Sequence, residues 1–146
     1  MSETGTDTRT LVVERLLPHP PEKIWRALTQ GALLEEWLMK NDFTPALGAK
    51  FTFRTQPMPH WDGVVDCEVV ALEPHRRLSY SWNTGGGKQL RTTVTWTLTA
   101  VEGGTRLRME QSGFEPQDDN NYKGAAYGWQ RNLETMEKLL AGLAAA

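Results

Sequence analysis

The sequence predicts an α+β domain in which a long C-terminal helix covers one face of an antiparallel sheet. Between residues 51 and 112, short segments alternate apolar and polar side chains and are separated by turn-forming residues. That pattern is typical of a sheet with one buried and one solvated face. From Tyr122 to Leu143, apolar residues recur every three or four positions instead, which is the period of a one-sided helix. Such a helix needs an apolar surface to cover, and the buried face of the sheet offers one.

The C-terminal helix carries the strongest periodicity in the chain. Its apolar stripe consists of Tyr122, Ala126, Trp129, Leu133, Met136, Leu140 and Leu143. Pro116 and the acidic run at residues 118–119 supply a breaker and candidates for the N-cap. Gly124 and Gly128 each lower helix propensity by about 1 kcal/mol relative to alanine. Small residues there allow close approach of a backbone or a ligand; a neutral surface position is the alternative.

The N-terminal part predicts a strand followed by two short helices. Leu11 to Leu17 is rich in Leu and Val, and prolines at 18, 20 and 21 end it. Apolar residues then recur at helical spacing over 24–28 and, after Gly31, over 33–38. Residues 41–50 contain Pro45 and Gly48 and are predicted to form a loop.

The remaining strands are predicted at 51–54, 64–72, 78–82, 91–99 and 105–112. Turns rich in Gly and Pro are expected between them, including Gly85 to Gly87. That glycine run precedes Lys88, yet it joins two strands and opens no helix, so we interpret it as a hairpin turn and not as a phosphate loop.

Length and composition restrict the class of protein. The chain has 146 residues, and we expect one domain over 9–146 with a disordered tail over 1–8. The net charge is −2 with both signs mixed along the chain, so no nucleic-acid partner is expected. Cys67 is the only cysteine, which excludes an internal disulfide. No apolar run is long enough for a signal sequence or a membrane span, and we expect a cytoplasmic protein.

Several short motifs, taken in order, resemble a known superfamily. They span most of the chain: Pro21–Thr29, Trp37, Gly48 before Phe51, Gly63–Val65, Arg77–Trp82, Gly104–Leu107 and Gly128-Trp129. In this order and spacing the chain resembles START-like domains, also called the SRPBCC or Bet v 1-like superfamily. The most similar branch is the C-terminal domain of the activator of heat-shock-protein ATPase.

The resemblance implies a helix-grip fold, in which a curved sheet wraps around the long helix and leaves an apolar cavity between them. Relatives bind lipids, polyketides or other hydrophobic molecules, and some branches catalyse cyclisation or aromatisation. No cofactor is implied. Gln111 stands where many relatives have a histidine, and Gly48-Ala49 replaces a common pair of glycines. The separate N-terminal domain of the chaperone activators has no counterpart here, so a chaperone partner is not expected.

Inward-facing residues of the strands and the helix are the candidate ligand-binding set. They are Phe51, Phe53, Trp61, Val65, Tyr80, Trp82, Trp96, Met109, Gln111, Tyr122, Trp129 and Leu133. The same aromatic side chains could instead fill a solid core, because burial alone stabilises the fold. Gln111 is polar among inward apolar neighbours, so its amide must bond to protein, water or ligand. Trp61 is expected in a loop over the cavity mouth.

Other chemically suggestive residues carry weaker signals. His60, Trp61 and Asp62 lie together, but no nucleophile accompanies them as acyl-transfer chemistry would need. His19, His60 and His75 are widely separated, and no metal site is predicted. Cys67 shares an inward face with valines and is expected to be a buried hydrophobe. Arg15, on the inward face of the first strand, is expected to pair with a carboxylate at the rim.

Three functions are compatible with this pattern. The first is binding of a hydrophobic small molecule, whether aromatic, polyketide-like or lipid, in a cavity between the sheet and the helix. The second is a cyclase- or hydrolase-type enzyme that uses the same cavity; no catalytic constellation is recognisable, because general acid–base work needs a titratable group near the reacting atom. The third is a chaperone-associated interaction protein. Homodimerisation stays open.

Overall fold

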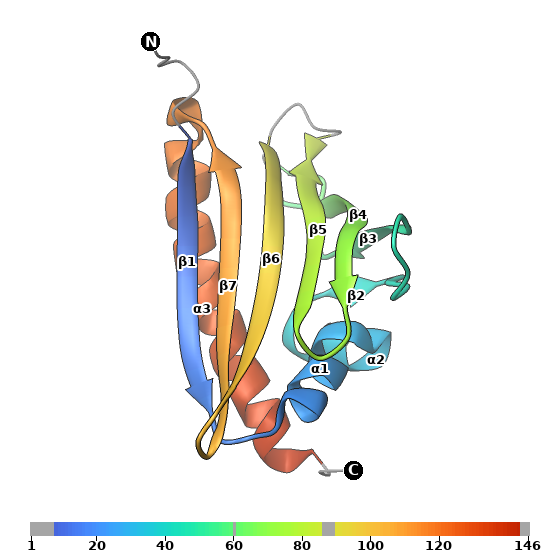
Figure 1. The fold of residues 1–146 in the computed structure, drawn as a ribbon. Helices are drawn as coiled ribbons and strands as arrows, with labels where there is room; N and C mark the ends of the chain where they lie inside the picture. Colours follow the sequence, from blue (N-terminus) through green and yellow to red (C-terminus); the bar gives the residue numbers. More distant parts are fainter. Residues whose placement is uncertain (1–7, 60, 86–89, 144–146) are drawn as a thin grey trace.

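The computed structural model describes residues 8–59, 61–85 and 90–143. Its elements, in chain order, are β1 (Arg9–Leu17), α1 (Pro21–Thr29), α2 (Gly31–Trp37), β2 (Lys40–Asn41), β3 (Lys50–Arg54), β4 (Val64–Glu73), β5 (Arg77–Thr84), β6 (Leu90–Val101), β7 (Gly104–Phe114) and α3 (Asp119–Gly142). The strands form a seven-stranded antiparallel sheet in the order β1-β7-β6-β5-β4-β3-β2 (Figure 1). This arrangement confirms the predicted α+β helix-grip fold.

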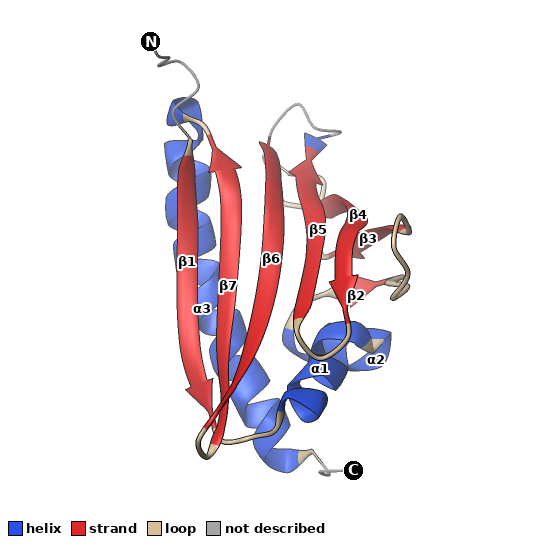
Figure 2. Cartoon of the chain, viewed as in Figure 1, coloured by secondary structure: helices blue, strands red, loops and turns tan. Residues whose placement is uncertain are grey.

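The long helix α3 lies against the sheet beside β1 and β7, while α1 and α2 gather near one end of the strands (Figures 1 and 2). The apolar stripe predicted for α3 is confirmed, because Trp129, Leu133, Met136 and Leu140 are each at most 3% exposed. The helix begins at Asp119, three residues before the predicted start. A 3-10 turn at Pro116–Asp118 precedes it, and the Glu115 amide donates to Asp118 Oδ2 at 2.9 Å across that turn.

The two short helices close one end of the core. Ile24, Ala27, Leu28, Leu34 and Trp37 point inward and are at most 2% exposed. The indole of Trp37 donates to the carbonyl oxygen of Ala27 at 2.8 Å, which satisfies its polar group inside the protein. Its ring also meets that of Trp96 edge-on, with centroids 5.8 Å apart. These contacts attach the helical hairpin to the middle of the sheet.

One prediction from the sequence was wrong at the start of the expected loop over 41–50. The short strand β2 pairs there with β3, with Lys40 opposite Arg54 and Asn41 opposite Phe53. The Asn41 side chain donates to the carbonyl oxygen of Gly31 at 3.0 Å and accepts from the amide of Phe43 at 3.1 Å. A two-residue strand is too short to show any side-chain period, so only the fold reveals it.

Aromatic side chains fill the centre of the sheet's inner face. Phe51 and Phe53 lie 5.3 Å apart, and each is within 6 Å of the ring of Tyr80. Trp96, which is fully buried, donates from its indole to the Tyr80 hydroxyl at 2.9 Å. Burial of each such side chain stabilises the fold by about 1.5–3 kcal/mol. This part of the interior is therefore solid core.

The connection between β3 and β4 depends on glycine. Gly63 has φ +82°, and a Cβ there would lie 2.3 Å from the carbonyl oxygen of Thr55. The Thr55 amide donates to the Gly63 carbonyl oxygen at 2.8 Å, which closes the base of the loop. The predicted turn at Gly85 to Gly87 and Lys88 falls mainly outside the described residues. Of the described helices, none is long and apolar enough to cross a bilayer.

Candidate ligand-binding site

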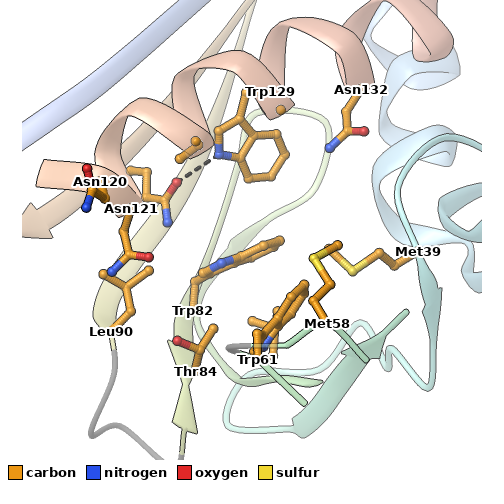
Figure 3. A pocket seen from close by; sticks show the side chains of 15 residues that line it. Met39, Met58, Trp61, Trp82, Thr84, Leu90, Asn120, Asn121, Trp129 and Asn132 are labelled. Carbon is orange, nitrogen blue, oxygen red and sulfur yellow. Dashed lines mark hydrogen bonds between the residues drawn. The ribbon is translucent and has the colours of Figure 1, made fainter. Parts of the chain in front are cut away.

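A pocket of about 740 Å³ lies between the first half of α3 and the inner face of the sheet (Figure 3). Strands β4 to β7, the β3–β4 loop and the segment after α2 form its other walls. Its lining residues are Met39, Met58, Trp61, Val65, Trp82, Thr84, Leu90, Gln111, Asn120, Asn121, Gly124, Ala125, Gly128, Trp129 and Asn132. This volume lies within the range of about 300–1,000 Å³ that is common for small-molecule sites.

Tryptophan rings from three elements form the apolar part of the pocket. The rings of Trp82 on β5 and Trp129 on α3 are 5.2 Å apart and inclined at 54°. Trp61, from the β3–β4 loop, lies beside Trp82, and Met39 and Met58 come together next to it (Figure 3). Aromatic faces and flexible thioethers together give a surface that adapts to flat apolar ligands.

The helix wall of the pocket is built from small and amide side chains. Asn121, Gly124, Ala125, Gly128 and Asn132 recur at helical spacing and so form one stripe of α3. A Cβ placed on Gly124 or Gly128 would meet no atom within 4 Å. The space beside these glycines belongs to the pocket, so the absent side chains enlarge it.

A buried hydrogen-bond chain crosses the base of the pocket. Trp129 Nε1 donates to Gln111 Oε1 at 2.8 Å, the dashed bond in Figure 3. Gln111 Nε2 donates to Thr92 Oγ1 at 3.0 Å, and that hydroxyl donates to the carbonyl oxygen of Trp82 at 2.7 Å. Gln111 is 1% exposed. The prediction that its amide must be bonded is confirmed, and the chain links α3 to β5, β6 and β7.

The β3–β4 loop brings Trp61 and Met58 to the pocket. The two residues form a small bridge in which Met58 N donates to Trp61 O at 2.7 Å and Trp61 N donates to Met58 O at 3.1 Å. The Trp61 indole also donates to the carbonyl oxygen of Val64 at 3.0 Å. Met58 is 58% exposed, so this loop forms the outer rim of the pocket.

The predicted ligand-binding residues divide into two groups. Trp61, Val65, Trp82, Gln111 and Trp129 line the pocket together. Phe51, Phe53, Tyr80, Trp96, Met109 and Leu133 lie in the core at 3% exposure or less and outside the pocket lining, because neighbouring side chains pack on every side of them. Tyr122 also lies outside the lining. The centroids of its ring and of the Phe114 ring are 5.2 Å apart in an edge-on contact, and the guanidinium carbon of Arg9 lies 3.8 Å from the centroid of the Tyr122 ring.

The predicted ligand-binding set left out these lining residues: Met39, Met58, Thr84, Leu90, Asn120, Asn121, Gly124, Ala125, Gly128 and Asn132. For Gly124 and Gly128 the sequence had indicated only that a backbone or a ligand could approach closely. The signal that could have found part of this set is the stripe of Asn, Gly and Ala beside the apolar stripe of α3. Two glycines four residues apart inside a helix are costly for stability, which itself points to a need for space.

The lining residues in the described part of the chain are all uncharged, and none carries a carboxyl, imidazole, amine or thiol group. Burial raises the pKa of the Cys67 thiol and of the Tyr80 phenol, so both stay protonated in the core. His60 lies outside the described residues, and with it the His60-Trp61-Asp62 grouping considered from the sequence. In the part of the chain that the structure describes, no three His, Cys, Asp or Glu residues converge as metal ligands would.

Arg15 pairs with a carboxylate as predicted, but away from the pocket and not at its rim. Its guanidinium pairs with Glu137 of α3 at 3.3 Å and also donates to the side-chain oxygen of Gln130. Both partners lie on the side of α3 that faces β1, away from the pocket lining. The arginine therefore ties the edge strand to the helix.

A curved antiparallel sheet that grips a long C-terminal helix, with an open pocket between them, defines a START-like or SRPBCC domain, a ligand-binding fold. The sequence profile of one family within it, described as Activator of Hsp90 ATPase homolog 1-like protein, matches residues 18–141. The chain belongs to this family. Comparison with curated proteins found no significant match.

Solved structures agree with this assignment. The chain is 52% identical to protein MLL2253 from Mesorhizobium loti, with a TM-score of 0.86, and the match covers 93% of this chain and 99% of that one. A protein from Rhodobacter sphaeroides is 25% identical with a TM-score of 0.73, covering 94% and 100%. DynU16, a protein of the dynemicin biosynthetic locus, shares the fold at 22% identity and a TM-score of 0.75, covering 91% of this chain and 47% of DynU16.

Proposed function

We propose that this protein binds a hydrophobic small molecule in the pocket between the sheet and α3. The observation that carries the proposal is the open pocket of about 740 Å³, walled by Trp61, Trp82 and Trp129 and widened by glycines of the helix. Aromatic walls with a few polar groups are the usual construction of a small-molecule site. Aromatic, polyketide-like and lipid molecules are the candidate classes.

The lining chemistry favours binding over acid–base catalysis. Its described polar side-chain groups are the amides of Gln111, Asn120, Asn121 and Asn132, the hydroxyl of Thr84 and the indole N–H groups of Trp61, Trp82 and Trp129. These groups orient a ligand through hydrogen bonds, but they do not exchange protons near neutral pH. The family description names a chaperone ATPase activator. Among the exposed apolar side chains of the described residues, Val12 and Leu16 lie on β1 at one edge of the sheet and Val70 lies on β4, four strands away, which does not support one continuous partner surface.

A thermal-shift screen identifies the ligand class. The purified protein is tested against flavonoids, fatty acids, sterols and polyketide aromatics, with native mass spectrometry of the untreated sample for a co-purified molecule. A ligand at a hundred times its dissociation constant adds about 2.7 kcal/mol to the free energy of unfolding. We expect at least one class to raise Tm by several degrees. A flat response from every class, with no bound mass, contradicts the proposal.

A pair of matched variants then places the ligand. Gly128→Leu puts a side chain into the pocket, whereas Gly142→Leu makes the same change on α3 outside the lining. A Cβ at either position would meet no atom within 4 Å. We expect Gly128→Leu to weaken binding of the identified class at least tenfold and Gly142→Leu to leave it unchanged. Equal affinities of the two variants for the ligand would show that the ligand binds outside this pocket.

A further inference from the structure

Gln111 is held in one amide orientation by its neighbours. We propose that this orientation directs its second N–H into the pocket, where it binds a carbonyl or ether oxygen of an uncharged, planar aromatic ligand. The inference rests on the proposed function, because it assumes that a small molecule occupies this pocket, and it narrows the ligand class.

The donor and acceptor roles around Gln111 determine which way its amide faces. The indole N–H of Trp129 can only donate, so the Gln111 atom 2.8 Å from it must be the oxygen. The amide nitrogen then lies on the other side, 3.0 Å from the hydroxyl of Thr92. That hydroxyl gives its own proton to the Trp82 carbonyl at 2.7 Å, so it accepts from Gln111. A reversed amide would place two donors against each other at Trp129.

One N–H of Gln111 remains after these bonds are counted. A primary amide carries two N–H groups, and the bond to Thr92 uses one. Among residues 8–59, 61–85 and 90–143, no acceptor bonds the other. Gln111 is 1% exposed yet lines the pocket, so the pocket is the space that this N–H can face. An unbonded buried donor is costly, which means that water fills the role until a ligand oxygen replaces it.

The surroundings select the rest of the ligand. The described lining residues are uncharged, so a carboxylate or ammonium placed beside Gln111 would lose its hydration without gaining a counter-charge. Trp82 and Trp129 line the same space with their ring centroids 5.2 Å apart, and Trp61 lies next to Trp82 (Figure 3). Aromatic ligands pack favourably against aromatic side chains. A neutral aromatic carbonyl compound meets both requirements.

Two probes of matched shape test the donor. Flavone is a neutral planar aromatic with a ring carbonyl, and 2-phenylnaphthalene has the same outline without any acceptor. We expect the wild-type protein to bind flavone at least tenfold more tightly than the hydrocarbon, measured as the dependence of Tm on probe concentration. Gln111→Met should remove that preference by weakening flavone binding alone. Gln130→Met, an equal change on α3 outside the pocket, should keep it.

Side-chain NMR gives a second measurement that needs no pocket variant and stands even where Gln111→Met does not fold. In the wild-type protein, flavone should shift the resonance of one of the two Gln111 side-chain amide protons far more than the other, and 2-phenylnaphthalene should shift neither strongly. Equal affinities for both probes, with unmoved Gln111 amide protons, would overturn this inference and leave the proposed function in place. Binding of neither probe to the wild-type protein would also overturn this inference, whereas the screen with fatty acids, sterols and polyketide aromatics decides separately on the proposed function.

Discussion

At the scale of single residues, the buried hydroxyl of Tyr80 and the buried indole of Trp96 form a specific hydrogen bond whose contribution to stability can be tested. The Tyr80 hydroxyl accepts the indole proton of Trp96 at 2.9 Å in the middle of the core. Tyr80 is 1% exposed and Trp96 is fully buried. Neither residue can exchange its partner for water.

We therefore expect Tyr80→Phe to destabilise the fold by about 1–3 kcal/mol, because the Trp96 N–H is left buried without an acceptor. Urea denaturation monitored by circular dichroism measures the change. Tyr127→Phe is the matched control: Tyr127 is 65% exposed and its hydroxyl bonds Arg131 at the surface. That control should change stability by less than about 0.5 kcal/mol. Equal effects at the two positions would refute the role given to the buried bond.

The pKa of His19 predicts how the free energy of unfolding depends on pH. Its Nδ1 lies 3.2 Å from the ammonium of Lys23, a residue only 7% exposed. Desolvation first, and the Lys23 charge second, lower the pKa of His19 in the folded protein. A lowered pKa means that the unfolded chain binds the proton more readily. The stabilising contribution is therefore complete above the unfolded pKa of about 6.5 and is lost as the pH falls below it.

The measurement is the urea midpoint at pH 7.5 and at pH 5.5. We expect the wild-type protein to be less stable at the lower pH, and His19→Gln to reduce that difference. His75→Asn, in the exposed turn between β4 and β5, serves as the control and should retain it. If His19→Gln loses as much stability as the wild type, the contact with Lys23 has no such effect.

At the scale of elements, α3 combines two surfaces with opposite demands. Its stripe from Trp129 to Leu140 covers the core, whereas the neighbouring stripe with Gly124 and Gly128 borders the pocket. The glycines weaken the helix and at the same time leave space for a ligand. This conflict between helix propensity and pocket volume is typical of functional sites.

Gly124→Ala and Gly128→Ala should each stabilise the free protein by about 1 kcal/mol, because alanine is the better helix former and its Cβ meets no atom there. For a domain of this size we expect Tm to rise by about 2–4 °C per substitution. Differential scanning calorimetry of the ligand-free variants checks this. The same substitutions should weaken ligand binding. A fall in Tm would show that the space beside the glycines is not open.

At the scale of the whole molecule, one continuous core joins the sheet to all three helices. Trp96 contacts Trp37 of α2 at 5.8 Å and Trp129 of α3 at 5.6 Å. We propose on this basis that residues 9–146 unfold as one cooperative domain, as chains of this size usually do. Tryptophan fluorescence and far-ultraviolet circular dichroism should then report the same urea midpoint. Two separated transitions would show that part of α3 or the α1–α2 hairpin unfolds independently.

Much of the fold could be predicted from side-chain periodicity. Apolar and polar residues alternate over β6 and β7, and apolar residues recur every three or four positions in α3. These patterns predict which residues point inward, and Val94, Leu107 and Leu133 are indeed buried. Boundaries were less predictable, because helix ends and two-residue strands such as β2 carry no period of their own. The prediction for α3 began at Tyr122, while the helix starts at Asp119.

The candidate site was predictable only in part, since periodicity reports that a side chain points inward but not how far away the opposite wall lies. Phe53 and Trp82 share that signal. Yet Phe53 is enclosed by other aromatic rings, whereas Trp82 borders open space. Asn121 and Asn132 read as ordinary polar positions on a helix surface. They became candidates only because the pocket lies between that half of α3 and strands β4 to β7.

The amino-acid pattern alone thus establishes the α+β layout with a long helix over the sheet, the inward faces of its strands and the presence of an unusual polar residue, Gln111, among apolar neighbours. Local spacing is enough for this, because each element buries one side of its own period. The tertiary structure decided where the interior is solid and where it is hollow, and which way the Gln111 amide faces. Both depend on contacts between residues far apart in sequence, such as Thr92 and Trp129, which no local pattern contains.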